Sequence, residues 1–309
     1  MDNLILHNER TIPLAEAHLS PGQAGLLAGW GVFTTLRLYE GQPFEFHRHW
    51  QRMARDAVRL NLAMIYEEEA VCRSIVRLAE ANHRAEGMAR VWFVRNRGGL
   101  WAGDNQVPAT DLIVCTHEIV PWPEKHRLML QGNAIFSAGV LAGTKILSWA
   151  QNALLFEKAR AAGFDDALLM NEKGELAECT SANIFLVRDG RVLTPPLSAG
   201  GLAGVTREVL LEIAPGAGIE MIEQTATPND LDSAKEVFVS STTREVAGVS
   251  LIQSQDVWVT VGSGAPACVG AKREFSCPGK VTRKLAQAFK AYVKSRIVAA
   301  APAPIATPG

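Results

Sequence analysis

The sequence predicts a mixed α/β (α+β) fold that is divided into two domains. Its 309 residues suffice for roughly two domains of about 150 residues each. Segments with the two-residue period of strands and segments with helical periodicity both occur along the chain, which indicates a mixed fold. The segment HEIVPWPEKHR, near residues 117–127, has two prolines and mixed charge and is the best candidate for a linker.

Composition and charge exclude several classes of protein. The 31 basic and 32 acidic side chains give a net charge of −1, which does not support binding to nucleic acid or an anionic membrane. No apolar run reaches the roughly 18–20 residues of a membrane-spanning helix, and the N-terminus lacks the apolar core of a secretory signal. Five scattered cysteines and seven dispersed histidines predict neither a disulfide framework nor a metal site, so a cytoplasmic location is expected.

In the first half of the chain we expect two strands, two helices and two further strands. The segment GVFTTLRLYEGQPF looks like two short strands around a Glu40-Gly41 turn. The following segment, HRHWQRMARDAVRLNL, carries apolar or aromatic residues at roughly helical spacing, and a second helix is expected over about 67–82. Residues 89–94 and 111–115 are expected to be strands.

The second half carries the clearest local signals. A strand near Ile135 and a loop lead into a helix that ends at Gly163. The segment DDALLMNEKGELAE predicts a hairpin with a Lys173-Gly174 turn, and NIFLVRDGRVLTPP predicts another with an Asp189-Gly190 type I′ turn. A helix in GLAGVTREVLLEIA, a strand in EVFVSS that ends in hydroxyl residues, and a last helix over about 281–296 complete the prediction.

Lys145, in LAGTKILSWA, is the first residue that suggests chemistry. Its neighbours Leu141, Ile146, Leu147 and Trp149 would partly desolvate it if they pack around it. Desolvation lowers the pKa of an ammonium group, and the resulting neutral amine can form an imine with an aldehyde. The alternative is a surface lysine whose stem lies along apolar surface.

Two further positions need more than a packing explanation. In AECTSANIF, Glu178 lies between apolar strand residues and small polar ones, where a carboxylate needs a hydrogen-bonding or cationic partner unless it is on an edge strand in water. In AGVTREVLLEIA, a Gly-Val-Thr step before a helix offers free N–H groups and a hydroxyl to a phosphate. The alternative for Thr206 is a helix cap alone.

The order and spacing of these segments resemble the class IV pyridoxal-phosphate enzymes. This superfamily includes branched-chain aminotransferases, D-amino-acid aminotransferases and 4-amino-4-deoxychorismate lyases. The resemblance begins at GWGVFTTLRLYEGQPFEFHRHWQRM, which looks like the family's strand, turn and His-x-x-Arg helix. It continues through TKILSWAQNALLFEKARAAGFDDALLMNEKGELAECTSANIFLVRDGRVLTPP, AGVTREVLLEIA and FVSSTTREV, and it covers most of residues 25–250 in the correct order.

The resemblance implies fold type IV, with pyridoxal 5′-phosphate bound between two domains. A small N-terminal α/β domain would span residues 1–116, a linker 117–129 and a larger pseudo-barrel domain 130–298, followed by a disordered tail over 299–309. The tail is mainly alanine and proline, with nothing to bury. A second subunit would complete the active site, so a homodimer is expected.

The resemblance also assigns roles to individual residues. Lys145 matches the Schiff-base lysine, which holds the cofactor aldehyde and then moves a proton between the substrate α-carbon and the cofactor. Glu178 matches the glutamate that pairs with the pyridine nitrogen and keeps it protonated. Arg52 matches the arginine that contacts the phosphate. The remaining implied phosphate contacts are Val205, Thr206 and Thr242, with Ser241 as a neighbour.

Two other motif residues are expected to have supporting roles only. His49, the histidine of the His-x-x-Arg motif, is expected to cap or pack within its helix. Asn183 is expected to support the loop of Glu178. Thr34 stands where the family usually has a glutamate.

The substrate site is less strongly marked. Candidate substrate-binding residues are Phe33, Thr35, Arg37, Arg90 and Arg97, with Arg95 as a further cation; the arginines are candidates for a clamp on a substrate carboxylate. Trp92 and Trp101 either shape an apolar pocket or pack in the core, and we expect core packing.

We expect a branched-chain-aminotransferase-like enzyme that moves an amino group between an amino acid or amine and a 2-oxo acid. The alternative is a 4-amino-4-deoxychorismate lyase, which removes the same proton and then releases pyruvate. Thr35 and the ECTSAN motif lean toward the lyase, whereas the lyase-type Arg-Gly-Tyr stretch is absent. A non-enzymatic cofactor-binding protein is disfavoured by the retained lysine and glutamate.

Overall fold

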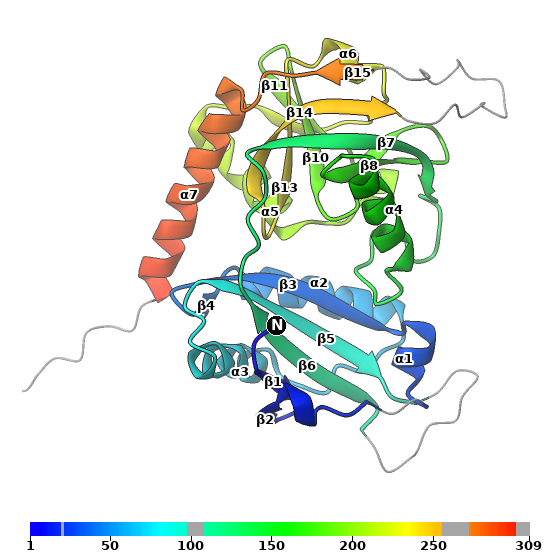
Figure 1. Ribbon diagram of the computed structural model, residues 1–309. Helices are drawn as coiled ribbons and strands as arrows, with labels where there is room; N and C mark the ends of the chain where they lie inside the picture. Colours follow the sequence, from blue (N-terminus) through cyan, green and yellow to red (C-terminus); the bar gives the residue numbers. More distant parts are fainter. Residues whose placement is uncertain (20–21, 98–107, 255–271, 301–309) are drawn as a thin grey trace, which may run out of the picture.

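The computed structural model describes residues 1–19, 22–97, 108–254 and 272–300. Their backbone forms two β-sheets, one from the residues up to His117 and the other from Lys125 onward, and helices pack against both (Figure 1). The mixed α/β architecture predicted from the sequence is confirmed. We call the two halves the small-sheet part and the large-sheet part.

The small sheet is antiparallel throughout, in the order β2-β1-β6-β5-β3-β4. Apolar side chains from one face of β3 and β5 pack against α2 and α3 in a single buried core. A Glu40-Gly41 turn, with both residues at positive φ, joins β3 to β4 as expected. The elements are β1 (Leu4–His7), β2 (Arg10–Pro13), α1 (Ala24–Ala28), β3 (Gly31–Tyr39), β4 (Gln42–Pro43), α2 (Phe46–Arg59), α3 (Glu68–Ala81), β5 (Gly87–Arg95) and β6 (Thr110–His117).

The large sheet is mixed, in the order β12-β11-β10-β13-β14-β7-β8-β9, with β15 also paired to β14. Both predicted hairpins are present, and Asp189 and Gly190 have the positive φ angles of a type I′ turn. The elements are β7 (Lys125–Ile135), α4 (Ala150–Ala161), β8 (Asp166–Asn171), β9 (Leu176–Cys179), β10 (Asn183–Arg188), β11 (Arg191–Thr194), α5 (Val205–Ile213), β12 (Met221–Glu223), α6 (Asp230–Ser233), β13 (Glu236–Ser241), β14 (Glu245–Ser254), β15 (Lys272–Glu274) and α7 (Lys280–Ala300).

The large sheet curls back on itself. Strands β10 and β9 lie at opposite ends of the six neighbouring strands β10-β13-β14-β7-β8-β9. Only residues 180–182 connect them in the chain, and the Cys179 N–H donates to the Ala182 carbonyl. Side chains from all six strands, including Leu128, Leu168 and Val249, meet in one buried cluster inside the curl. This closed arrangement is the pseudo-barrel that the resemblance implied.

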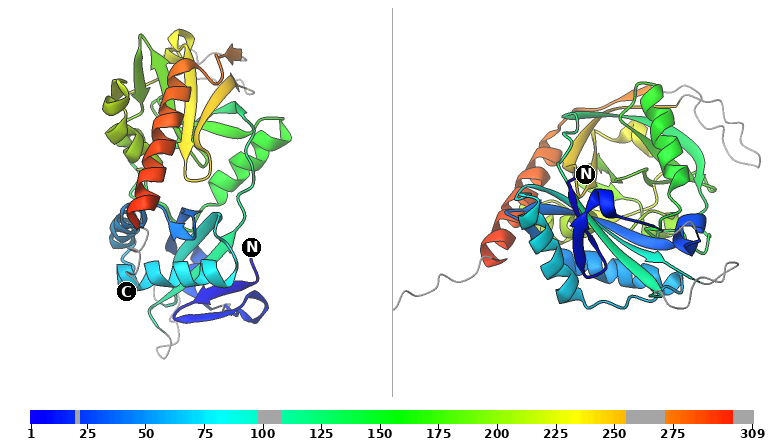
Figure 2. Two further views of the ribbon diagram at one scale, coloured as in Figure 1. Left: turned by 90° about the vertical axis from the view of Figure 1, so that its left-hand side faces the viewer. Right: turned by 60° about the horizontal axis from the view of Figure 1, so that its bottom comes forward.

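Helices cover the outside of the curled sheet. Helix α4 packs on β7 and β8 through Ala159, and α5 and α7 pack together over Phe185 and Phe238. Helix α7 runs along the large-sheet part and its C-terminal end reaches the small-sheet part (Figure 2). There the Tyr292 hydroxyl donates to the Glu45 carboxylate at 2.8 Å.

Two expected boundaries differ from the structure. Strand β7 begins at Lys125, so the last five residues of the expected linker 117–129 are strand, because they pair in parallel with β14 and β8. Helix α7 continues to Ala300, so the first two residues of the expected tail 299–309 are helical; residues 301–309 lie outside the described residues. The division into domains over 1–116 and 130–298 stays a prediction.

Candidate active site

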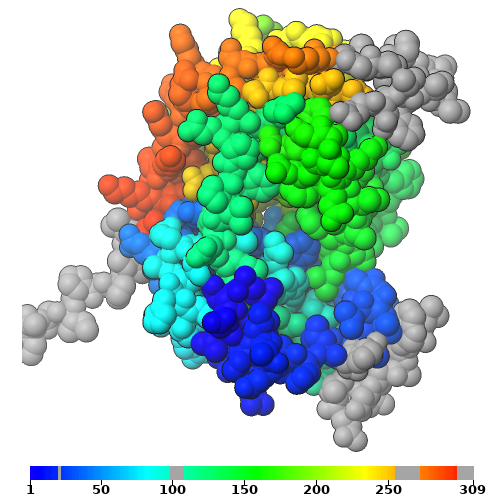
Figure 3. Space-filling view, viewed as in Figure 1, coloured from blue at the N-terminus to red at the C-terminus, as the bar shows by residue number. Residues whose placement is uncertain are grey.

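A cavity of about 700 Å³ lies between the two parts of the molecule. The surface is hollowed there beside the connecting segment (Figure 3). Strands β3 and β5 of the small sheet line one side of the cavity, and the segment around Lys145, strand β9 and the start of α5 line the other. The predicted site residues that come together in it are Phe33, Thr35, Arg52, Arg90, Lys145, Glu178, Val205, Thr206, Ser241 and Thr242.

Lys145 reaches the cavity because its segment is attached to the small sheet. Its carbonyl accepts the Phe33 N–H at 3.0 Å, and the Leu147 N–H donates to the Gly31 carbonyl at 2.9 Å. The Lys145 Nζ lies 4.6 Å from the centre of the Phe33 ring. Burial, with a smaller contribution from Arg52, lowers the pKa of the Lys145 amine to about 8, although Glu178 opposes this shift. The interpretation of Lys145 as an ordinary surface lysine is wrong.

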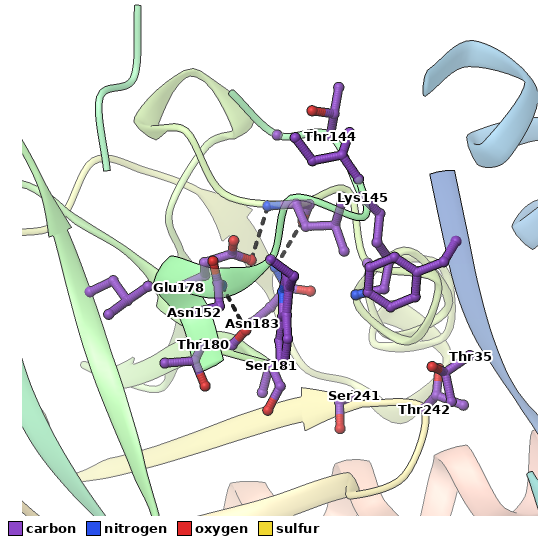
Figure 4. Close-up of a pocket in the computed structure, with 18 of the residues that line it drawn as sticks. Thr35, Thr144, Lys145, Asn152, Glu178, Thr180, Ser181, Asn183, Ser241 and Thr242 are labelled. Carbon is purple, nitrogen blue, oxygen red and sulfur yellow. Dashed lines mark hydrogen bonds between the residues drawn. The ribbon is translucent and has the colours of Figure 1, made fainter. Parts of the chain in front are cut away.

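Glu178 belongs to β9, which ends the sheet path, but its side chain lines the cavity (Figure 4). Its Oε2 accepts the Leu202 N–H at 3.0 Å, and the Asn183 side chain donates to the Leu202 carbonyl at 2.9 Å. Asn183 therefore supports the segment that holds Glu178, as expected. Burial raises the pKa of Glu178 to about 7, although the Leu202 hydrogen bond and the charge of Lys145 oppose this shift.

A candidate anion site lies at the start of α5. The N-cap residue is Gly204, and no side chain caps the helix, so Thr206 is not the cap. A Cβ atom at Gly204 would meet the Asn183 Oδ1 at 2.0 Å, so a larger residue there would displace the Asn183 side chain. With Val205 and Thr206 lining the cavity, unpaired helix N–H groups and a hydroxyl face the same space, which suits a phosphate.

Arg52 supplies the positive charge at this end of the cavity. It is 6% exposed, and it donates to the Ala203 carbonyl at 3.1 Å and to the Thr34 hydroxyl at 2.9 Å. Its Nε is buried and has no hydrogen-bond partner among the described residues. Burial lowers the pKa of the guanidinium to about 10, so Arg52 stays charged at neutral pH. A buried cation beside a cavity is expected to bind an anion.

His49 lies behind this group and does not line the cavity. Its Nδ1 is 2.7 Å from the Thr34 hydroxyl, which accepts a hydrogen bond from Arg52 and is therefore expected to donate to the ring. Burial holds the pKa of His49 well below its usual value, so the ring is neutral. The packing role expected for His49 agrees with this position.

The small sheet forms the opposite side of the cavity because alternate residues of a strand face opposite ways. Phe33 pairs with Trp92, and Thr35 pairs with Arg90, so all four share one face. The Arg90 Nε lies 3.4 Å from the Thr35 hydroxyl, and burial lowers the pKa of the Arg90 guanidinium. Trp92 lines the cavity, so core packing is the wrong prediction for this residue.

Two predicted substrate contacts lie outside the cavity lining. Arg37 is on the same strand face as Thr35 but further along, where it pairs with Glu86 at 3.6 Å. Arg97 follows the end of β5, and its carbonyl accepts a hydrogen bond from Arg95. Arg95 itself stacks on Trp30 and does not line the cavity either. Trp101 lies outside the described residues.

The structure adds lining residues that the sequence did not single out. Trp122 comes from the connecting segment, and Trp149 follows Lys145 closely in the chain. Thr180 and Ser181 come from the ECTSAN motif, and the Thr180 carbonyl accepts the Asn152 amide at 2.9 Å. The proline-flanked tryptophan and the run of small polar residues were visible in the sequence, but neither has a spacing that indicates a cavity.

Comparison with known proteins agrees with this geometry. The profile of the amino-transferase class IV family matches residues 31–252. A putative branched-chain-amino-acid aminotransferase of Methanocaldococcus jannaschii is 28% identical over 92% of this chain and 94% of its own. A D-alanine aminotransferase of Bacillus licheniformis is 26% identical over 85% of this chain and 91% of its own.

A solved structure shares the fold. It is a T.th. branched-chain amino acid aminotransferase complexed with N-(5′-phosphopyridoxyl)-L-glutamate, and it superposes on this chain with a TM-score of 0.78. It is 28% identical to this chain, and the match covers 96% of this chain and 95% of that one.

Proposed function

The chain belongs to the class IV aminotransferase family, and on that premise we propose that it transfers an amino group between an amino acid or amine and a 2-oxo acid. Its cofactor is pyridoxal 5′-phosphate. The observation that carries the proposal is that the Lys145 amine, the Glu178 carboxylate and the anion site around Arg52 all face one buried cavity.

The residues present fit this cofactor at each of its polar groups. Lys145 would hold the aldehyde, because burial leaves part of its amine neutral near pH 8. The Glu178 carboxylate would pair with the pyridine nitrogen. Arg52, which lines the cavity, would bind the phosphate together with the start of α5. The hydroxyls of Thr206, Ser241 and Thr242 line the same cavity and would complete the phosphate site.

Each side chain then has a defined part in the reaction. When bound, the cofactor supplies an electron-withdrawing ring that stabilises negative charge on the substrate α-carbon. Glu178 keeps a negative charge beside the ring nitrogen and so favours its protonated form. The Lys145 amine, with a pKa of about 8, would take a proton from the substrate α-carbon near neutral pH. It would then deliver this proton to the cofactor.

Arg90 is the cation that we propose for the substrate carboxylate. It lies on the cavity face of β5, and its guanidinium is within 3.4 Å of the Thr35 hydroxyl. Apolar side chains surround it, including Met88 and Trp92 on the same face of the strand. A carboxylate clamp within an apolar pocket suits an amino acid with an apolar side chain, as in branched-chain-type aminotransferases.

The second candidate function is 4-amino-4-deoxychorismate lyase. The observation that favours it is Thr35, which lines the cavity beside Arg90. Both reactions need the same proton removal by Lys145. They differ in the product, because a lyase releases pyruvate and a transaminase leaves the amino group on the cofactor.

We also propose a cytoplasmic homodimer. Phe136 and Val140, in the segment that leads to Lys145, are 65% and 85% exposed, and apolar side chains so close to a cavity mouth suit a subunit interface. The four cysteines in the described part of the chain are free thiols, which suits a reducing compartment. No helix in the described ranges is long and apolar enough to cross a membrane. Light scattering after size exclusion tests the dimer.

A half-reaction panel tests the proposed activity. Purified protein loaded with pyridoxal 5′-phosphate is mixed with single L-amino acids, D-amino acids, chiral amines or aminodeoxychorismate. We expect absorbance and chromatography to show pyridoxamine 5′-phosphate with at least one amino donor, and Lys145→Ala to lower the rate by about 100- to 10,000-fold. Pyruvate release from aminodeoxychorismate, with no pyridoxamine 5′-phosphate from any donor, would instead establish the lyase.

A further inference from the structure

One face of α2 carries polar residues at helical spacing. Arg48, Arg52, Asp56 and Arg59 follow one another at intervals of four, four and three residues, so their side chains form a stripe along the helix. The apolar side chains of α2 face the small-sheet core instead. The stripe contacts the large-sheet part from the start of α5 to the segment that carries Lys145.

Asp56 is the member of this stripe that contacts Lys145. Its side chain is 1% exposed, and its Oδ2 accepts the backbone N–H of Lys145 at 3.0 Å. A buried carboxylate is costly unless its charge has a specific partner, so its presence requires an explanation beyond packing. Its Oδ1 is 3.8 Å from Arg55, a weak ion pair with a side chain that is 55% exposed.

Arg59 holds the same segment one turn further along α2. Its guanidinium donates to the Val140 carbonyl at 2.8 Å and to the Ala142 carbonyl at 3.0 Å. On the opposite side, the Phe33 N–H donates to the Lys145 carbonyl. The backbone of residues 140–145 is therefore fixed from both α2 and β3, and the bond from Asp56 is the one made at Lys145 itself by a charged side chain.

We propose that Asp56 is a positioning residue for the reaction: its carboxylate fixes the backbone of Lys145, and its buried negative charge adds to the proton affinity of the Lys145 amine. This inference rests on the proposed aminotransferase activity and deepens it. Nothing in it requires Asp56 to touch a substrate or the cofactor.

The charged groups around Lys145 and Asp56 show in which direction Asp56 shifts the pKa of the Lys145 amine. Lys145 is surrounded by Arg52 and Asp56 from α2, Glu178 from β9 and Arg90 from β5. Burial and the two arginines lower the pKa of its amine, whereas Glu178 and Asp56 raise it. Asp56 faces Arg52, Arg55 and Arg59 on its own helix as well as Lys145, and burial raises the pKa of its carboxyl. Removal of the Asp56 charge should therefore lower the pKa of Lys145.

Two substitutions of Asp56 separate the effect of its hydrogen bond on the position of Lys145 from the effect of its negative charge. In Asp56→Asn the amide oxygen still accepts the Lys145 N–H, but the charge is gone. In Asp56→Ala both are lost. We expect Asp56→Asn to shift the pH profile of kcat to lower pH while it keeps most of the wild-type maximum. We expect Asp56→Ala to lower kcat by about 10- to 100-fold, with a smaller change in KM, because misplacement of a catalytic group is costly. Asp189→Asn, the same change at an exposed turn, is the control.

A second readout does not depend on turnover. In the cofactor-free protein, the rate of trace acetylation of Lys145 by acetic anhydride, followed by peptide mass spectrometry, gives the pH at which the amine is half protonated. We expect that pH to be lower in Asp56→Asn than in wild type and unchanged in Asp189→Asn. Equal midpoints in wild type and Asp56→Asn would overturn the inference, even if Asp56→Ala fails to fold. Wild-type protein that transaminates no donor would instead overturn the proposed function and leave the acetylation result valid.

Discussion

Lys145 and Glu178 are two ionisable groups whose environments bring their pKa values close together. Burial lowers the pKa of the lysine to about 8 and raises that of the glutamate to about 7. Each group would be fully ionised at neutral pH in water, and burial of a charge opposes this. The pKa of the Lys145 amine therefore lies close to neutral pH, which is where an acid or base catalyst is most effective.

The raised pKa of Glu178 predicts how the stability of the cofactor-free protein depends on pH. The folded-state pKa of about 7 lies above the reference value of 4.5, so between these pH values the folded protein binds more protons than the unfolded chain. The stability contributed by this group is therefore greatest at low pH and is lost as pH rises from 4.5 through 7. Glu178→Gln removes the titration, so its stability relative to wild type should increase over that interval.

Urea denaturation of cofactor-free wild type and Glu178→Gln at several pH values measures this difference. Titrating groups that are distant from position 178 are common to both proteins and largely cancel in the comparison. A stability difference between the two proteins that stays constant from pH 4.5 to 7 would contradict the raised pKa.

Single residues also show where sequence-based prediction of the site is limited. Lys145, Glu178, Arg52 and Thr206 follow from motifs and line the cavity. Arg37 is predicted only as a candidate cation for a substrate carboxylate, but it lies further along β3, and its pairing with Glu86 depends on the three-dimensional packing. A motif identifies a residue type and its strand face, whereas the length of the cavity along the strand is a property of the folded chain.

At the scale of elements, α2 and α5 are joined beside the candidate anion site. Arg48 on α2 bonds to Glu208 and, at 2.6 Å, to Glu212 on α5, and it also contacts Glu45. Arg48 and Arg52 are four residues apart, as are Glu208 and Glu212, so successive turns of each helix take part. This ion-pair bridge joins the helix that carries Arg52 to α5.

Arg48→Ala should weaken cofactor binding, although Arg48 does not line the cavity. Exposed ion pairs contribute about 0.2–1 kcal/mol each, so loss of the two bridging pairs should destabilise the protein by about 0.5–2 kcal/mol and weaken cofactor binding about 2- to 10-fold. Fluorescence titration with pyridoxal 5′-phosphate at low and high salt measures the effect, which salt should reduce.

Arg73→Ala, an exposed arginine on α3, is the matched control for that measurement. Equal cofactor dissociation constants for wild type, Arg48→Ala and Arg73→Ala at low salt would show that the bridge does not position Arg52.

Elements with strong local signals are predicted well from the sequence. The Glu40-Gly41 and Asp189-Gly190 turns fix their hairpins because both residues of each turn adopt positive φ. Part of strand β7 falls in the predicted linker because its partners, β14 and β8, are distant in the chain, and the two prolines just before it suggest a loop. The hairpin of β1 and β2 is not predicted, since each strand has only four residues and neither alternates regularly between apolar and polar residues.

At the scale of the whole molecule, the cavity couples the two sheets. The small-sheet part contributes Arg52 and Arg90, and the large-sheet part contributes Glu178 and the start of α5. Direct contacts between the parts include the bond from Tyr292 of α7 to Glu45 and the bridge from Arg48. A ligand that contacts both parts therefore stabilises their arrangement as well as its own site.

Removal of the cofactor should therefore change both the stability and the cooperativity of unfolding. A ligand present at about 100 times its dissociation constant stabilises the folded state by about 2.7 kcal/mol. For a protein of this size we expect calorimetry to show a Tm at least about 5 °C higher with pyridoxal 5′-phosphate than without it. We expect a single transition in the loaded protein and a broader or divided one in the cofactor-free protein, because the ligand joins α2 to α5. Pyridoxal, which lacks the phosphate, should give a smaller shift, since Arg52 and the start of α5 would have no anion to bind. Equal Tm values and equal transition widths with and without the phosphorylated cofactor would contradict a site shared by the two sheets.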